Sequence, residues 1–240
     1  MTGPAMDVTP YGEKEIFSAF HESKSFSKHL LTIYSLAVGV NAKKIVDLGI
    51  GSTTRALRFA AQTTGGVCYS CDVDTARFTS LLEHQDKHWK FFLGASEKFF
   101  AQLDGPYDFV LHDAAHDYYQ VKMDLEAIIP KMKRFGLICI HDTQQTELSH
   151  DMLAAIKDAL RGKAVSMVNL PFSSGLAIIR IEESALPEIV PSSGLLPDGR
   201  IETVPIACAM QVVEGADYGK ADTSLRRWLH WRARKVIKGS

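Results

Sequence analysis

One short stretch constrains the fold of this chain more than any other feature of its sequence. An apolar run, residues 45–48, is typical of a buried strand, and Gly49 and Gly51 interrupt it. Ser52 and Thr53 are positioned to cap the helix that follows. A strand, a glycine turn and a helix N-terminus together form a nucleotide-sized socket, because the missing Cβ atoms let a ligand approach free backbone N–H groups.

Asp47 lies two residues before the first glycine and distinguishes this stretch from the dinucleotide-binding fingerprint. That fingerprint has a third glycine where this chain carries Thr54. An acid at this position repels a pyrophosphate, but it suits a cationic or hydroxyl-rich ligand. From this stretch we predict the following cofactor-binding residues: Asp47, Gly49, Gly51, Ser52 and Thr53.

Strand-like and helix-like segments alternate along most of the chain. After the first strand, the apolar patterns predict strands at 67–71, 89–93, 107–111, 137–140, 164–170 and 176–181. Helices between the first five strands favour parallel pairing through crossovers, whereas the last two strands form a hairpin. We therefore predict an α/β fold with a mostly parallel seven-stranded sheet, a terminal antiparallel hairpin and helices on both faces. Within it, we expect a helix over 75–82 and a turn at 134–136.

Changes in composition divide the chain into three parts. Residues 1–42 contain an arm and one or two helices, which would cover either the cofactor cleft or only an edge of the sheet. Residues 43–184 contain the predicted nucleotide-binding domain. Residues 185–240 begin with a proline-rich irregular segment and end in a basic helix. That helix would either contact an anionic partner or pack its two tryptophans on the domain with a solvated basic face.

Composition and charge exclude several classes of protein. The net charge of −1 leaves no overall field that would draw the chain to nucleic acid. The sequence has no signal peptide and no apolar run of spanning length, so a cytoplasmic location without a membrane span is expected. Its four cysteines lack the spacing of a disulfide framework and are expected to be free thiols in a reducing compartment. The oligomeric state, including a homodimer, is left open.

Polar side chains follow five of the predicted strands at the point where each strand ends. Because the carboxyl ends of parallel strands meet at one edge of a sheet, ligands of open α/β sheets bind there. Asp72 lies about 20 residues past the glycine turn, the spacing at which an acid reaches ribose hydroxyls. Asp74 is expected to cap the next helix, which is compatible with that role of Asp72. In strand order, the polar groups at this edge are as follows: the glycine turn together with Asp47; Asp72; Ser96; the pair Asp113 and His116; and the pair His141 and Asp142.

Two aspartates at this edge form a predicted metal site. Asp113 and Asp142 follow predicted neighbouring strands, so their carboxylates can share one cation. Carboxylate oxygens with open water positions suit Mg²⁺, and the imidazole of His141 would also admit Mn²⁺, Fe²⁺ or Zn²⁺. We therefore predict a divalent metal site, with Mg²⁺ as the first choice, formed by Asp113, His141 and Asp142. In the alternative interpretation, His141 and Asp142 only bond loop backbone.

The pattern Asp47-x-Gly49-x-Gly51 resembles motif I of the class I S-adenosylmethionine-dependent methyltransferases. Segments 107–125 and 135–143 resemble one branch of them, the metal-dependent O-methyltransferases that act on sugar hydroxyls and natural products and are relatives of the catechol enzymes. The resemblance covers residues 43–182, most of the chain. It implies a Rossmann-like methyltransferase fold, S-adenosyl-L-methionine as cofactor, and a small molecule as methyl acceptor.

The resemblance also implies roles for individual residues. Ser96, in a Gly-Ala-Ser segment, would lie near the adenine; the alternative is a helix cap with nothing bound. Asp113 and Asp142 match the acids that hold the ion in that branch, and Asp113 is also expected to contact the cofactor. His116, three residues after Asp113, matches the base of the sugar-modifying members. The chain departs from the branch at His141, where relatives often carry Glu or another residue.

The implied reaction transfers an electrophilic methyl group to a hydroxyl oxygen. A divalent ion would lower the pKa of that hydroxyl, and His116 would take its proton, since imidazole titrates near neutral pH. His112 is a rival base, but it should point to the opposite sheet face from Asp113. Two other functions stay open. One is a nicotinamide-dependent oxidoreductase, against which Asp47 and Thr54 count, and the other is a non-catalytic binding module on the same fold.

Overall fold

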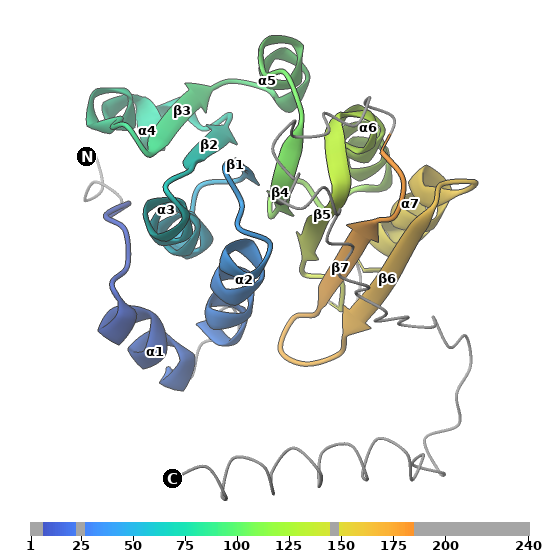
Figure 1. Cartoon of the computed structure of the whole chain (residues 1–240). Coiled ribbons are helices and arrows are strands. Elements are labelled where there is room, and N and C mark those ends of the chain that lie inside the picture. The colour runs from blue at the N-terminus through green and yellow to red at the C-terminus, as the bar shows by residue number, and fades with distance from the viewer. Residues whose placement is uncertain (1–6, 23–26, 145–148, 185–240) are drawn as a thin grey trace, which may run out of the picture. The chain divides into compact units, whose positions relative to one another are not determined.

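A mixed sheet of seven strands organises the part of the chain that this computed structural model describes, residues 7–22, 27–144 and 149–184 (Figure 1). The strand order is β3-β2-β1-β4-β5-β7-β6. The parallel strands are β1 (Lys44–Leu48), β2 (Val67–Asp72), β3 (Trp89–Leu93), β4 (Tyr107–His112) and β5 (Met132–His141). The hairpin of β6 (Val165–Leu170) and β7 (Leu176–Ile181) joins the sheet through β7, which pairs antiparallel with β5. The predicted α/β fold is therefore confirmed.

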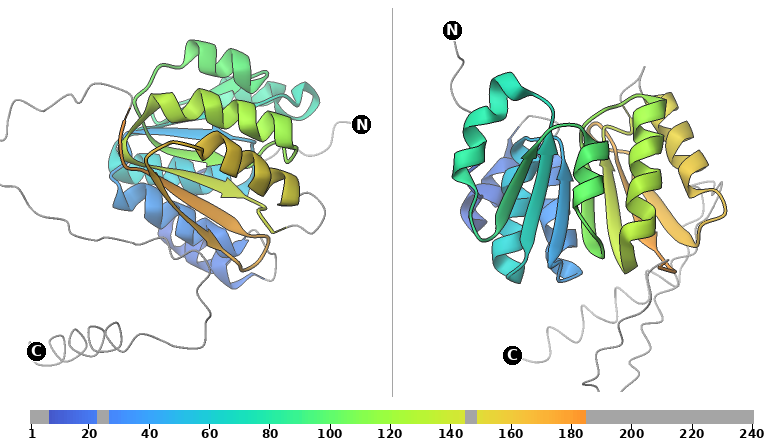
Figure 2. Two further views of the ribbon diagram at one scale, coloured as in Figure 1. Left: turned by 90° about the vertical axis from the view of Figure 1, so that its right-hand side faces the viewer. Right: turned by 90° about the horizontal axis from the view of Figure 1, so that it is seen from above.

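Helices cover both faces of this sheet (Figure 2). The helices on one face are α2 (Ser27–Gly39), α3 (Ser52–Thr64), the short α4 (Thr75–Phe78) and the 3-10 helix η1 (Thr79–His84). Those on the other face are α5 (Ser96–Gln102), α6 (Tyr118–Ile128), the 3-10 helix η2 (Ile129–Lys131) and α7 (Ser149–Leu160). The first helix, α1 (Glu13–His21), packs on α2. One or two helices were expected before the first strand, and the structure has two.

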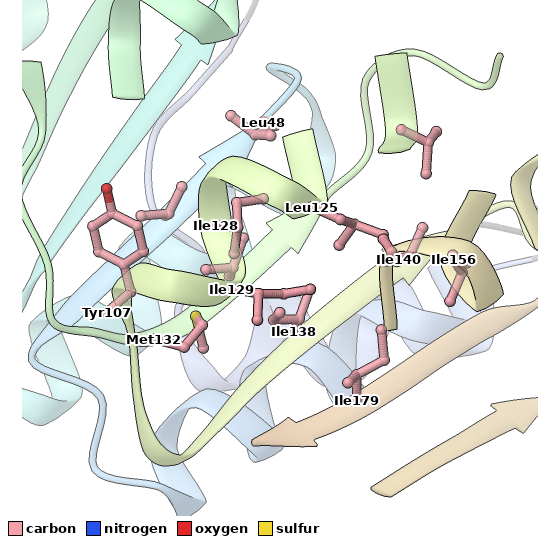
Figure 3. Close-up of a cluster of buried hydrophobic side chains, with 14 of the residues drawn as sticks. Leu48, Tyr107, Leu125, Ile128, Ile129, Met132, Ile138, Ile140, Ile156 and Ile179 are labelled. Atoms are coloured by element: carbon pink, nitrogen blue, oxygen red, sulfur yellow. The ribbon is translucent and has the colours of Figure 1, made fainter. Parts of the chain in front are cut away.

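The larger hydrophobic core lies between the sheet and helices α5–α7 (Figure 3). Side chains of β5 alternate between the two cores: Ile138 and Ile140 face this one, and Leu137 and Cys139 face the core under α2 and α3. Ile138, Cys139 and Ile140 are fully buried. Each buried aliphatic side chain contributes about 1.5–3 kcal/mol to folding. A strand buried on both faces reads as a continuous apolar run, which is why the sequence predicted β5 correctly over this part.

The cysteines follow the same alternation. Cys68 lies in one core and Cys71 in the other, as their odd spacing predicts. Cys68, Cys71 and Cys139 are free and buried. Burial raises the pKa of the Cys71 thiol to about 12, so this thiol stays protonated and unreactive. The predicted free thiols are confirmed for these three, and Cys208 lies outside the described residues.

Two local predictions are wrong. The predicted turn at 134–136 is part of β5, which begins at Met132. The pairing of β5 with β4 shifts register there, and Phe135 adopts a left-handed backbone (φ +63°), so the strand continues through a bulge. The predicted helix over 75–82 is a single α-helical turn followed by the 3-10 helix η1.

Some predictions concern residues outside the described ranges. Residues 1–6 of the N-terminal arm and all of 185–240, with the irregular segment and the basic helix, lie outside them. The division into three domains therefore stays a prediction. Among the described residues, none of the helices is long and apolar enough to cross a membrane.

Candidate active site

The turn after β1 is clamped between its two neighbouring strands. The Gly49 N–H donates to the Cys71 carbonyl (2.9 Å), and the Asp113 N–H donates to the Leu48 carbonyl (2.9 Å). Gly49 adopts φ +93°, and a Cβ at this position would lie 2.1 Å from the carbonyl oxygen of Asp113. Only glycine fits such a close approach of the turn to the segment after β4.

Helix α3 begins at Ser52, but its cap differs from the predicted one. Neither Ser52 nor Thr53 caps it; instead the Gly51 N–H donates to Oγ1 of Thr54 at 3.0 Å. A hydroxyl at the third helical position reaches back to the N–H before the helix more readily than one at the first position. The hydroxyl of Thr53 turns toward the rim and donates to Asp113 Oδ2 at 3.4 Å.

A cavity of about 490 Å³ opens at the carboxyl ends of the first four strands. This volume is in the range of small-molecule sites. Its walls come from the turns after β1, β2, β3 and β4 and from α6. The principal lining residues are Gly49, Ile50, Asp72, Val73, Gly94, Ala95, Ser96, Asp113, Ala114, Gln120 and Asp124.

Asp72 is at the position predicted for a ribose-binding acid. Its Oδ2 accepts from the Ile50 N–H and its Oδ1 from the Asp74 N–H, both at 2.9 Å. These bonds fix the carboxylate at the cavity wall and leave lone pairs on both oxygens for a ligand. Asp74 caps α4 as predicted, because its carboxylate accepts from the Arg77 N–H at 3.1 Å.

A hydrogen-bond network that the sequence did not predict lies in the wall of the cavity. Ser96 Oγ donates to Asp124 Oδ1 at 2.6 Å, and Gln120 Nε2 donates to the same oxygen at 3.0 Å. His112 Nε2 lies 3.0 Å from Asp124 Oδ2, so His112 points toward α6. The available signal was the spacing of Gln120 and Asp124, which places two polar residues on one helix face.

Asp47 is fully buried below the glycine turn and does not line the cavity. Its Oδ2 accepts from the Ser70 hydroxyl at 2.7 Å, while its Oδ1 has no hydrogen-bond partner among the described residues. Burial raises the pKa of Asp47 to about 7, although the hydrogen bond from Ser70 and the nearby Thr54 hydroxyl act to lower it. Of the predicted cofactor-binding residues, those that line the cavity are Gly49, Asp72, Ser96 and Asp113; those that do not are Asp47, Gly51, Ser52 and Thr53.

Next to this cavity lies the predicted metal-binding set, Asp113, His141 and Asp142, which we call the cation cluster. One ligand atom from each residue lies within 4.8 Å of the others. His141 Nδ1 is 3.3 Å from Asp113 Oδ1 and 3.0 Å from Asp142 Oδ1. Successive residues of a strand point to opposite faces, but the left-handed backbone of Asp142 (φ +60°) lets His141 and Asp142 face one point.

The electrostatics of the cation cluster favour a positive charge. Burial alone lowers the pKa of His141, but Asp113 and Asp142 outweigh it and raise this pKa to about 9. Burial raises the pKa of Asp142, but its contacts with His116 and His141 hold it well below the usual range. His141 Nδ1 is buried without a hydrogen bond of good geometry, although it faces two carboxylates. An imidazole nitrogen and two carboxylates in this arrangement fit a divalent cation.

His116, the predicted base, lies beside the cation cluster. Its Nε2 is 3.2 Å from Asp142 Oδ2, and the ring is partly exposed. The contact with Asp142 raises the pKa of His116, against the effect of burial. Asp117 holds the segment in place by capping α6, since its Oδ1 accepts from the Gln120 N–H at 3.0 Å.

The sequence missed a second histidine at this site, His29 of α2. Its Nδ1 lies 2.9 Å from His141 Nε2, and its Nε2 lies 3.2 Å from the Phe172 carbonyl oxygen. Burial, with the nearby His141, lowers the pKa of His29 to about 4, so this ring is neutral near neutral pH. Helix α2 therefore reaches the rim of the sheet and does more than cover its edge.

Comparisons with known proteins agree with this geometry. Residues 46–143 match a family model described as a methyltransferase domain. No protein of curated function matches the chain. An O-methyltransferase of Bacillus cereus in complex with S-adenosylhomocysteine (SAH) aligns with a TM-score of 0.56 at 12% identity, over 72% of this chain and 92% of that one. An SAH-bound methyltransferase of Podospora anserina aligns with a TM-score of 0.54 at 13% identity, over 74% of this chain and 100% of that one. At these identities, the likeness establishes the Rossmann-like methyltransferase fold.

Proposed function

We propose that the chain, whose residues 46–143 match a methyltransferase domain, is an S-adenosylmethionine-dependent enzyme that methylates a hydroxyl of a small molecule with the help of a divalent cation. One observation carries this proposal: Asp113 belongs both to the wall of the cavity and to the cation cluster. A cofactor in the cavity and a cation in the cluster would therefore be neighbours. Such an arrangement is suited to bringing a methyl donor and an acceptor oxygen together, which is the main task of a transfer enzyme.

Different polar groups of the cavity wall would bind the ribose, the adenine and the positively charged end of an adenosyl cofactor. Asp72 would accept hydrogen bonds from ribose hydroxyls, and Ser96 with Asp124 would border the adenine. Asp113 would attract the positively charged end of the cofactor through its carboxylate. Gly49 would let that end approach the backbone, because no side chain projects from the turn.

In the proposed methyl transfer, the cofactor and the cation activate the two reactants, and side chains of the protein accept the proton that is released. S-adenosylmethionine brings an electrophilic methyl group, and a divalent ion in the cation cluster would lower the pKa of a hydroxyl bound to it. The Asp142 carboxylate lies 3.2 Å from Nε2 of His116 in an ion-pair contact and cannot donate a proton, so we assign the proton of that ring to Nε2. Nδ1 of His116 would then take the proton of the hydroxyl, and Asp142 would stabilise the imidazolium that forms.

The test is methyl transfer from labelled S-adenosylmethionine to a panel of catechols, other phenols and sugars. We expect label in at least one hydroxylated product, loss of that product in the presence of a chelator, and recovery when Mg²⁺ or Mn²⁺ is added back. Full transfer in chelator would show that the cation is not needed and would leave His116 as an unassisted base. Absence of transfer to any acceptor, together with absence of SAH binding, would contradict the proposal as a whole.

Of the two alternative functions, the nicotinamide-dependent oxidoreductase is disfavoured by the methyltransferase-domain match over residues 46–143. The non-catalytic binding module makes a separate prediction. A protein of that kind would form no methylated product, and replacement of His116 would change none of its measurable properties.

A further inference from the structure

His29 lies behind the cation cluster, on the side away from the two carboxylates, and the proposed function gives it no role. Its ring meets that of His141 edge to face, with centroids 5.0 Å apart and planes 83° apart. Both side chains are buried, with exposed fractions of 0% and 3%. The Phe172 ring also packs against His29, with centroids 4.9 Å apart, and helps to hold the ring orientation.

The hydrogen-bond partners of His29 determine which of its nitrogens carries the proton. The Phe172 carbonyl oxygen, 3.2 Å from His29 Nε2, can only accept a hydrogen bond. His29 Nε2 must therefore be the donor in this contact. In a neutral ring, Nδ1 is then left with a lone pair.

This lone pair in turn determines the tautomer of His141. His29 Nδ1 and His141 Nε2 are 2.9 Å apart, and two lone pairs at this distance would repel each other. His141 Nε2 must therefore donate its proton to His29 Nδ1. The opposite direction would leave the His29 Nε2 lone pair facing the Phe172 carbonyl oxygen. The Ser174 hydroxyl also approaches His141 Nε2, but at 3.4 Å it is a longer contact.

From this chain of donors and acceptors we propose that His29 is a positioning residue: when His141 is neutral, as cation binding requires, His29 keeps its remaining proton on Nε2, so that the Nδ1 lone pair faces Asp113 and Asp142. The inference rests on the cation-assisted function proposed above. It makes a nitrogen the third ligand of the cluster, next to two carboxylates. His29 itself is not a ligand, because both of its nitrogens are engaged in hydrogen bonds.

A ligand set with one fixed imidazole nitrogen favours certain cations. Mn²⁺, Co²⁺ and Zn²⁺ accept nitrogen ligands, whereas Mg²⁺ prefers oxygen. Loss of the partner that orients a metal-bound histidine costs about 10–100-fold in metal affinity. The affinity for Mn²⁺ should therefore depend on His29 more strongly than the affinity for Mg²⁺ does.

The experiment is a Mn²⁺ titration of the full-length protein, followed by the electron paramagnetic resonance signal of free Mn²⁺, with SAH affinity measured in parallel. We expect His29→Ala to weaken Mn²⁺ binding about 10–100-fold and to leave SAH binding unchanged. His29→Gln, whose side-chain oxygen can accept from His141 Nε2, should recover most of the affinity. Tyr34→Phe is the matched control, because Tyr34 lies on the same helix and its hydroxyl, which the variant removes, hydrogen-bonds to Thr63. Its Mn²⁺ affinity should equal that of the wild type.

Two outcomes separate the inference from the proposed function. If the wild type binds Mn²⁺ and a folded His29→Ala binds it equally well, the role of His29 is refuted and the cation cluster stands. If the wild type binds no divalent ion, cation assistance and the role of His29 both fail. Should His29→Ala not fold, the nitrogen-15 spectrum of the Zn²⁺-loaded wild type decides the matter. It must show His29 protonated at Nε2, and protonation at Nδ1 would overturn the inference.

Discussion

The Gly49→Ala variant is expected to lose at least about ten-fold in affinity for SAH, and closer to a hundred-fold if the turn moves as a whole. The added Cβ would lie 2.1 Å from the Asp113 carbonyl oxygen and 2.8 Å from its carbonyl carbon. Neither atom belongs to a flexible side chain, so the backbone must shift on one side of the contact. Both segments line the cavity, and either shift changes its shape. Calorimetric titration of SAH into the variant measures the effect.

Gly65→Ala is the matched control for backbone strain. Gly65 also has a left-handed backbone, at φ +67°, but a Cβ there meets no atom within 4 Å. Gly65 ends α3, at the opposite end of that helix from the glycine turn. The free energy of unfolding of Gly65→Ala should therefore fall by about 1 kcal/mol, while its affinity for SAH should equal that of the wild type. Wild-type affinity in Gly49→Ala, or an equal loss in Gly65→Ala, would mean that the clash with Asp113 does not shape the site.

The second large effect is expected for His116→Ala, which should slow methyl transfer by about 10²–10⁴-fold, the usual contribution of a general base. The variant keeps Asp113, His141 and Asp142, so binding of SAH and of Mn²⁺ should change little. A single-turnover measurement with saturating cofactor and the acceptor found in the panel isolates the transfer step.

His88→Ala serves as the control for the loss of a histidine. His88 Nδ1 bonds to the Gly66 carbonyl at 2.8 Å, and the residue precedes β3, so it lines neither the cavity nor the cation cluster. The rate of methyl transfer by His88→Ala should stay near that of the wild type. A rate for His116→Ala within about three-fold of the wild type would remove His116 from the chemistry and leave the cation as the sole activator of the hydroxyl.

The sheet was predictable because its strands are buried on both faces and read as apolar runs between glycines and polar residues. The predicted bounds of β3 (Trp89–Leu93) and β7 (Leu176–Ile181) match those observed. The first half of β5 was not predictable, because Arg134 and Gly136 have the composition of a turn. Only the shift in pairing with β4 allows the strand to continue through them.

The cation cluster was predictable for a different reason. Parallel neighbouring strands end at one edge, so acids directly after β4 and β5 must come close together. The role of Asp47 could not be judged in this way, because the sequence does not tell whether a side chain at the end of a central strand points into the cavity or under the turn. His29 was missed because its partner His141 lies 112 residues away, and one histidine in an apolar helix carries no sign of such a contact.

The most direct test of the proposed site is anomalous diffraction from crystals of the wild-type protein grown with SAH and Mn²⁺. We predict one Mn²⁺ peak between the carboxylates of Asp113 and Asp142 and Nδ1 of His141, with the adenosyl group in the cavity beside Gly49. A peak at another location, no peak at saturating Mn²⁺, or an adenosyl group outside this cavity would contradict the proposed site.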